Sequence, residues 1–333
     1  MKLFKILPLL LVASLTACSD QIYFTGQFYS MDTFISMKHK NTRGYPGEKT
    51  MAEIKNAANE VDAIADSYKK RDVVSIYDIN QTNEKIEISK RLHDILSFTL
   101  NAQSKTKFFN PFVCSLSTKW KESLAKGEIL SDEIISEELA KINSSSLTLS
   151  SLGNAYYAER TGEATLDLGA IAKGYFLDRC QDLCSAYVPT GDYLINAGDS
   201  SVLLGTNSET KKGVDKGDYV AKLSGLSKPT YIHCHNCFIS TSGIEKQCTE
   251  INGFTYSHIV NPVTGSAISL YDTVIVINNN STYENGSFGD ALSTSFMMTP
   301  LEEIKEYDQN SHIEVIVIKD DAVLYQSPSI TLY

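Results

Sequence analysis

The feature that most constrains the fold is the uneven distribution of helical and strand patterns along the chain. Between residues 50 and 184, apolar residues recur mainly at helical spacing. From residue 193 to 325, short apolar runs that suit strands alternate with turn residues. There is no internal repeat and no low-complexity linker after residue 30. This pattern predicts a single α+β domain with mixed, largely antiparallel sheets packed against helices.

The spacing also predicts the individual elements. Ser89 precedes one predicted helix as a candidate N-cap. Helices are expected over 50–68, 90–105, 133–142, 170–184 and 289–298, and a hairpin after the Ser-rich stretch 143–151. Strands are expected over 31–37, 164–168, 193–196, 201–204, 219–223, 238–240, 258–260, 273–277, 314–318 and 322–325.

The N-terminus has the pattern of a secretory signal. Two lysines precede the apolar run 6–13, and Leu15-Thr16-Ala17-Cys18 matches the bacterial lipobox, although an ordinary cleaved signal remains the alternative. The run is too short to span a bilayer. We therefore expect a signal peptide over 1–17, a lipid-anchored tether over 18–30 and a folded domain over 31–333. Acylated Cys18 would hold the protein at the extracytoplasmic face of the cell membrane.

Charge and cysteine content narrow the function further. The chain has 30 basic and 40 acidic residues, a net charge of −10, and no basic tract, which argues against nucleic-acid binding. Six cysteines follow Cys18, and export would permit disulfides between them. Three states are possible for the cysteines of the segment His233-Cys234-His235-Asn236-Cys237: a disulfide, free buried thiols or a structural zinc site.

Two segments place chemical groups at defined turns. In 165–175, a predicted strand ends at Asp167, and after a glycine turn Lys173 lies in the first turn of a helix, which suits an anion. In 255–265, His258 precedes an Asn-Pro-x-Thr-Gly turn. Each segment alone is also compatible with a purely structural role.

A third segment combines a carboxylate with hydroxyl groups. Asp290 and Thr294 are four residues apart on a predicted helix and share a face, with Ser293 beside them. Hard oxygen ligands of this kind suit Mg²⁺, which also bridges substrate phosphates. The alternative is that Asp290 caps the helix and that the hydroxyls hydrogen-bond back onto the helix backbone.

Taken together and in order, these segments resemble the ApbE family of FAD:protein FMN transferases. The resemblance extends over about residues 31 to 326. It is carried by Met31-Asp32-Thr33, residues 68–70, 109–111 with Leu116 and Trp120, 166–175 with Asp178, 196–198, 240–243, 257–265 and 290–294.

The resemblance implies an enzyme that uses Mg²⁺ to cleave the pyrophosphate of FAD and releases AMP. The FMN half would be attached through a phosphoester bond to a Thr or Ser hydroxyl of an acceptor protein with an FMN-binding domain. The acceptor would be an exported or membrane electron-transport subunit, or an extracellular flavoprotein reductase.

The resemblance also implies the site residues. Asp290 and Thr294 would bind Mg²⁺, with Ser293 and the backbone carbonyl of Ala170, and His258 and Asp290 would act in catalysis. The FAD-binding positions would be Met31, Tyr68, Phe109, Asn110, Asp167, Lys173 and Val260.

Two positions depart from the family pattern, and two other functions remain open. Asp199 follows Asn196-Ala197-Gly198 where the family usually has a second glycine, and Cys114 stands where glycine is common.

An Mg²⁺-dependent FAD pyrophosphatase would use the same residues with water as the acceptor. A flavin-binding lipoprotein without catalysis is the alternative of a different class.

Overall fold

The structure is a computed structural model that describes residues 23–42, 44, 46–209, 213–245, 248–279 and 285–333. The predicted signal peptide and Cys18 lie outside the described residues. The helices are α1 (Gly47–Ala65), α2 (Ile76–Asn80), α3 (Lys90–Lys105), α4 (Cys114–Ala125), α5 (Asp132–Ser144), α6 (Ala172–Tyr187), α7 (Gly286–Phe296) and α8 (Leu301–Gln309), with a 3₁₀ turn at Pro111–Val113.

The strands fall into four sheets within the described residues. They are β1 (Tyr23–Ser30), β2 (Thr33–Lys40), β3 (Ile86–Ile88), β4 (Ser146–Leu152), β5 (Ala155–Thr161), β6 (Tyr193–Ala197), β7 (Ser201–Leu204), β8 (Tyr219–Lys222), β9 (Tyr231–Cys234), β10 (Cys237–Gly243), β11 (Cys248–Ile251), β12 (Phe254–Ser257), β13 (Thr273–Asn279), β14 (Ile313–Lys319) and β15 (Ala322–Gln326).

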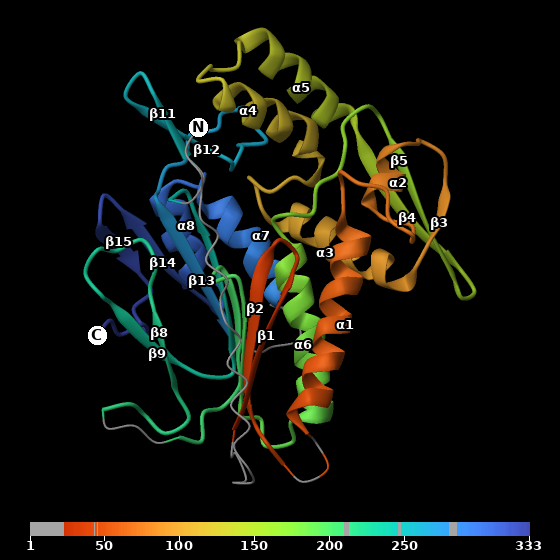
Figure 1. Cartoon of the computed structure of the whole chain (residues 1–333). Coiled ribbons are helices and arrows are strands. Elements are labelled where there is room, and N and C mark those ends of the chain that lie inside the picture. The colour runs from red at the N-terminus through yellow and green to blue at the C-terminus, as the bar shows by residue number, and fades with distance from the viewer. Residues whose placement is uncertain (1–22, 43, 45, 210–212, 246–247, 280–284) are drawn as a thin grey trace, which may run out of the picture.

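The largest sheet organises the molecule. In the described part of the chain it has eight strands in the order β1-β2-β6-β7-β10-β13-β14-β15, and every neighbouring pair is antiparallel. Figure 1 shows α1 and α6 running beside β1 and β2, with α4 and α5 at the top of the view. The small sheet β3-β5-β4 and the pair β8-β9 lie on opposite sides of the molecule. The predicted α+β class is confirmed.

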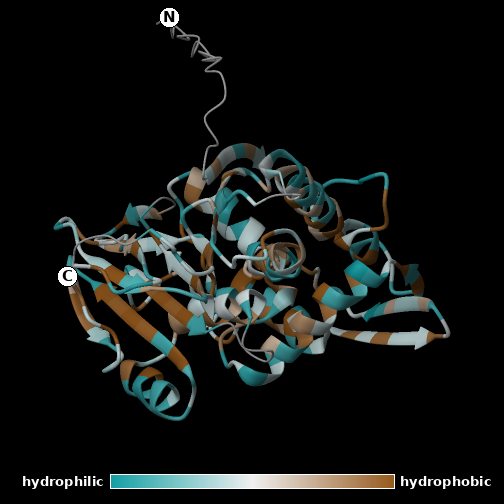
Figure 2. Cartoon of the chain, turned by 90° about the horizontal axis from the view of Figure 1, so that it is seen from below, coloured by the Kyte–Doolittle hydropathy of each residue, from teal (hydrophilic) through white to brown (hydrophobic). Residues whose placement is uncertain are grey.

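The central strands are buried on both faces, which explains their continuous apolar runs. Val274 and Val276 of β13 belong to the core that the helices cover. Ile275 and Ile277 point the other way, into a second core closed by Tyr219 and other residues of β8 and β9. Figure 2 shows the hydrophobic colour concentrated on strands of this sheet. The sheet thus separates a helical layer from a strand-rich layer.

Most predicted helices are confirmed with small shifts of their ends. The helix predicted over 90–105 matches α3, and the Ser89 hydroxyl accepts a hydrogen bond from the Leu92 N–H at 3.1 Å as its N-cap. The predicted hairpin is β4-β5, but it begins earlier than expected, because most of the Ser-rich stretch 143–151 forms β4 itself. Helices α2, α4 and α8 are additions to the sequence prediction. No helix among the described residues is long and apolar enough to cross a membrane.

Three expectations are corrected by the structure. Residues Tyr23–Ser30, expected in the tether, form β1 and pair with β2 along their whole length, so the sheet begins before residue 31. Residues 258–260 are not a strand, because β12 ends at Ser257. Residues 164–168 are extended but join no sheet.

The segment 164–168 has no strand partner because other groups satisfy its backbone. The Asn80 side chain accepts from the Leu166 N–H at 2.7 Å and donates to the Leu166 carbonyl at 2.9 Å. The Asp167 N–H donates to the Pro111 carbonyl at 2.8 Å. A buried amide and a neighbouring turn therefore replace the sheet ladder that the apolar alternation predicts.

Candidate functional site

The candidate site is built where α6 and α7 come close together. A Cβ at Gly174 would lie 2.1 Å from the Gly286 carbonyl oxygen, a distance that no side chain tolerates. Glycine at this position therefore lets the α6 backbone touch the start of α7. The contact brings the Gly174 N–H within 2.6 Å of Asp290 Oδ2. One glycine thus joins the turn after Asp167 to the carboxylate on α7.

Asp290 is a buried carboxylate surrounded by hydrogen-bond donors. It is 7% exposed, and its Oδ1 accepts from the Ser201 hydroxyl at 2.9 Å. Burial raises the pKa of Asp290, while the nearby charge of Lys173 and hydrogen bonds, including one from Ser240, oppose that rise. The carboxylate is therefore placed where a cation would relieve its desolvation.

Three hydroxyl groups form a second part of the same site. Ser242 Oγ lies 2.9 Å from Ser293 Oγ and 3.1 Å from Thr294 Oγ1. Both α7 hydroxyls also donate to the Asp290 carbonyl, at 3.0 and 3.1 Å. Strand β10 therefore packs its hydroxyls against the face of α7 that carries Ser293 and Thr294.

These groups fit Mg²⁺. The oxygen donors are one carboxylate and several hydroxyls, and the Ala170 carbonyl belongs to the turn just before α6. No cluster of three His, Cys, Asp or Glu side chains able to hold a metal occurs in the part of the chain that the structure describes. A Mg²⁺ ion here would therefore be bound by Asp290 and neutral oxygens and completed by water or phosphate oxygens.

A second carboxylate fixes the start of α7. Asp178 of α6 accepts from the Gly286 N–H at 2.6 Å and from the Ser287 N–H at 3.1 Å, and it also binds the Ser287 hydroxyl. A negative charge at a helix N-terminus is favourable. Burial nevertheless raises the pKa of Asp178 to about 7, even though the three hydrogen bonds oppose it. Asp178 sets the position of α7, and therefore of Asp290.

The turn before α6 carries a further polar cluster. The Tyr68 hydroxyl donates to Asp167 Oδ2 at 2.6 Å, and Asp167 Oδ1 accepts from the Gly169 N–H at 2.6 Å. Tyr68 is 64% exposed, so its ring is free to contact a ligand. Burial of the hydroxyl and the Asp167 charge raise the pKa of Tyr68. Cys114 lies next to the Tyr68 hydroxyl, and burial raises the pKa of its thiol.

The other predicted flavin-site residues occupy varied environments. Met31 lies in the tight turn between β1 and β2 with φ +54°, and Asn110 caps the 3₁₀ turn through the Phe112 N–H at 2.9 Å. Phe109 and Val260 are buried in the core, at 5% and 7% exposure. Neither side chain is open to solvent, so Phe109 presents no exposed ring face to a ligand.

His258 lies on an exposed loop whose base is firmly held. The Ser257 N–H donates to the Ala267 carbonyl at 2.8 Å, and Asn261 Oδ1 accepts from the N–H groups of Val263 and Thr264 at 2.8 and 3.1 Å. His258 itself is exposed. A rigid loop that presents an imidazole suits a proton acceptor.

The departure at Asp199 is accommodated in a tight turn between β6 and β7. Asp199 has φ +63°, a left-handed conformation that usually favours glycine. Asn196 stabilises it, because its Oδ1 accepts from the Asp199 N–H at 2.8 Å and its Nδ2 donates to Asp199 Oδ1 at 2.9 Å. The turn leads directly to Ser201, so the Asp290 contact is retained.

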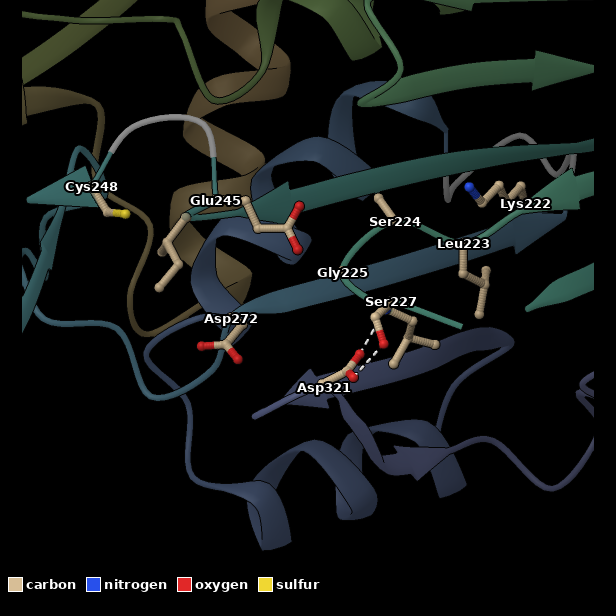
Figure 3. A pocket seen from close by; sticks show the side chains of 11 residues that line it. Lys222, Leu223, Ser224, Gly225, Ser227, Glu245, Cys248, Asp272 and Asp321 are labelled. Carbon is tan, nitrogen blue, oxygen red and sulfur yellow. Dashed lines mark hydrogen bonds between the residues drawn. The ribbon is translucent and has the colours of Figure 1, made fainter. Parts of the chain in front are cut away.

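A separate open cavity of about 630 Å³ lies beyond the end of β10. Figure 3 shows the carboxylates of Glu245, Asp272 and Asp321 around it, and the hydrogen bond between Ser227 and Asp321. Its lining contains none of the predicted site residues. The α6-α7 junction is the better candidate, because the chemically suited groups converge there.

The sequence prediction missed several residues that build this junction. Ser201 and Asp178 were not assigned a role, nor was Ser242. Ser240 and Ser242 lie two residues apart on β10 and therefore share a face of the strand. This spacing is the sequence signal that could have identified Ser242 as part of the site. The contact of Asn80 with Leu166 had no sequence signal, since it joins residues 86 positions apart.

The architecture matches solved structures of one class of protein. The ApbE protein of Thermotoga maritima superposes with a TM-score of 0.73 at 21% identity, covering 92% of this chain and 97% of that one. The flavin transferase ApbE of Vibrio cholerae has a TM-score of 0.72 at 22% identity, covering 92% and 97%. These likenesses define an ApbE-type fold.

The sequence comparisons identify the family. A profile of the ApbE family matches residues 31–317, and this chain therefore belongs to the ApbE family. The FAD:protein FMN transferase of Vibrio cholerae is 24% identical over 93% of this chain and 91% of its own length. That of Chlamydia muridarum is 22% identical over 83% and 84%. The resemblance seen in the sequence is confirmed, and with it membership in a family of flavin-transferring enzymes.

Proposed function

We propose that this chain is a Mg²⁺-dependent FAD:protein FMN transferase. The observation that carries the proposal is the buried Asp290 carboxylate, which the Gly174 N–H and the Ser201 hydroxyl hold in place on α7, the helix that also carries the Ser293 and Thr294 hydroxyls. The curated relatives carry this activity in their names. Asp290 and Thr294, with Ser293 and the Ala170 carbonyl, would hold the metal.

The reaction is a phosphoryl transfer. The oxygen of an acceptor Thr or Ser hydroxyl forms a bond to the phosphorus of the FMN half of FAD, and the bond from that phosphorus to the AMP oxygen breaks. Bound Mg²⁺ supplies charge neutralisation at the pyrophosphate. The departing AMP keeps both electrons of the broken bond.

The chain's own residues position the reactants and move the proton. His258, on its rigid exposed loop, would accept the proton of the acceptor hydroxyl. Lys173, in the first turn of α6, places a positive charge close to Asp290 and would interact with the phosphates of bound FAD. Tyr68, fixed through Asp167, would pack its exposed ring against a flavin or adenine ring.

The test of the proposal uses the chain with FAD, Mg²⁺ and a purified protein that carries an FMN-binding domain. We expect flavin fluorescence on the acceptor band in a denaturing gel, a mass gain that corresponds to FMN, and AMP in equal amount. Free FMN and AMP without a labelled acceptor would contradict transfer and indicate a pyrophosphatase. Bound FAD without AMP would indicate a flavin-binding protein.

We also propose that the protein is a lipoprotein, anchored through acylated Cys18 at the extracytoplasmic face of the cell membrane. The proposal is supported by the order of charged, apolar and small residues before Cys18. Its acceptor would then be an exported or membrane electron-transport subunit, or an extracellular flavoprotein reductase. Metabolic labelling with a fatty acid should mark the full chain but not its Cys18→Ser variant. Equal labelling of both would contradict the anchor.

A further inference from the structure

Two thiols come together at the junction between β9 and β10. A single strand through this segment would point Cys234 and Cys237 to opposite faces. The structure has no such continuous strand, because β9 ends at Cys234 and β10 begins at Cys237. The two-residue bend between them leaves Cys237 inside the core next to β8 and β9, with Cys234 packed against the same core.

The bend is held in place from outside. The Asn236 N–H donates to the Gly205 carbonyl at 3.0 Å, and Asn236 adopts a left-handed conformation with φ +46°. His235 Nδ1 lies 2.5 Å from Asp218 Oδ1. These contacts fix the two residues between the cysteines, and the paired thiols are therefore built into the fold.

The two thiols differ in their access to solvent. Cys237 is 1% exposed, whereas Cys234 is partly exposed at the edge of the same core. The hydrogen bond to Cys234 and burial raise the pKa of Cys237 well above its usual range. A reagent in solution therefore meets Cys234 first.

We propose that Cys234 and Cys237 form a site of reversible thiol–disulfide exchange that links β9 to β10. The Cys234 thiolate attacks one sulfur of an external disulfide, forms a mixed disulfide and expels one thiolate. Cys237 then loses its proton and attacks the Cys234 sulfur, and the second half of the reagent leaves as a thiol. Two electrons pass to the external disulfide, which is the oxidant.

The other described cysteines provide internal comparisons. Cys180 and Cys184 are fully buried and one helical turn apart on α6, a geometry that does not suit a bridge. Cys248 is exposed and belongs to the separate β11-β12 sheet. Among the cysteines that the structure describes, only Cys234 and Cys237 share one core across a short bend and include a thiol that solvent reaches.

The site lies on the side of β10 that faces away from α7. Cys237 belongs to the core under β8 and β9, whereas Ser240 and Ser242, at the alternate positions, meet α7. Oxidation of Cys234 and Cys237 is measured by the mass of the peptides that contain them. That measurement is therefore independent of flavin transfer.

The experiment equilibrates the reduced full chain with mixtures of reduced and oxidised glutathione, alkylates the remaining thiols and maps the peptides by mass. We expect a bond between Cys234 and Cys237, seen as the loss of two hydrogen atoms, while Cys180 and Cys184 remain thiols. The Cys237→Ser variant should instead retain glutathione on Cys234, because the second step is missing. The Cys248→Ser control should form the bond as the wild type does.

Two results would overturn the proposal. The first is that both thiols remain open to alkylation under conditions that attach glutathione to exposed Cys248. The second is that the Cys237→Ser variant holds no more glutathione on Cys234 than the wild type does. The first result is measured on the wild-type chain, and it therefore decides the question even if the Cys237→Ser variant fails to fold.

Discussion

Replacing Gly174 by alanine tests whether the close approach of α6 and α7 builds the site. Gly174 lies in a helix, where helix propensity alone favours alanine by about 1 kcal/mol. The structure predicts instead that alanine at position 174 lowers the stability of the fold. The added Cβ would lie 2.1 Å from Gly286 O, 2.4 Å from Gly286 C and 2.7 Å from Ser287 N, all of which are backbone atoms that cannot rotate away.

The magnitude follows from two costs. Overpacking of this kind costs about 1 to 3 kcal/mol. Separation of the helices also breaks the hydrogen bond from Gly174 to the Asp290 carboxylate, worth about 1.5 to 3 kcal/mol for a charged acceptor. After subtraction of the propensity gain, the Gly174→Ala chain should be less stable by about 1.5 to 5 kcal/mol.

Urea unfolding measures this difference, and AMP release from FAD shows whether the site is disturbed. A matched control is Gly127→Ala, where φ is +74° and nothing lies within 4 Å of the added Cβ. It should lose about 1 to 2 kcal/mol through backbone strain alone and keep full AMP release. A Gly174→Ala chain as stable as the wild type, or more stable, would refute the reasoning.

Three further predictions address the polar contacts around the site. Asn80→Ala should lower stability in urea by about 2 to 4 kcal/mol and raise the KM for FAD, because both backbone groups of Leu166 lose their partner. Tyr68→Phe should weaken FAD binding about two- to tenfold in a fluorescence titration, through loss of one hydrogen bond to Asp167. The Asp178 carboxyl carbon should titrate in an NMR experiment with a pKa of about 7.

The Asp178 prediction includes a sign for the stability. The pKa of Asp178 is raised from 3.8 to about 7 by folding, so the folded chain binds an extra proton between those values. Its contribution to stability is therefore fully present below pH 3.8 and is lost as the pH rises through about 7. The Asp178→Asn chain should lack this pH-dependent part of the unfolding free energy. A pH dependence of stability identical to that of the wild type would contradict the raised pKa of Asp178. Unchanged stability of the Asn80→Ala chain would contradict the prediction for Asn80. Unchanged FAD affinity of the Tyr68→Phe chain would contradict the prediction for Tyr68.

Local patterns in the sequence predicted the regular elements well. The Ser89 cap and the apolar spacing of α3, and the continuous apolar run of β13, each depend on residues close together in the chain. The resemblance to the ApbE family supplied the site residues, and the structure brings Asp290, Ser293 and Thr294 together with Ser242.

Contacts between distant residues could not be predicted in this way. The alternation of 164–168 has the period of a strand, but the partner of Leu166 is a side chain on α2. Strand β1 was assigned to the tether because its pairing with β2 is invisible in its own residues. Gly174 falls within the helix predicted over 170–184, but its contact with Gly286 depends on how the two helices pack.

The most direct test of the proposed function compares Asp290→Asn with Asp182→Asn. Asp182 is an exposed carboxylate on α6, whereas Asp290 is buried at the junction with α7. The measurement is AMP release from FAD across a Mg²⁺ titration, with a protein acceptor present. We predict that Asp290→Asn abolishes the Mg²⁺-dependent release and that Asp182→Asn leaves it unchanged. Undiminished release from the Asp290→Asn chain would contradict the proposed site.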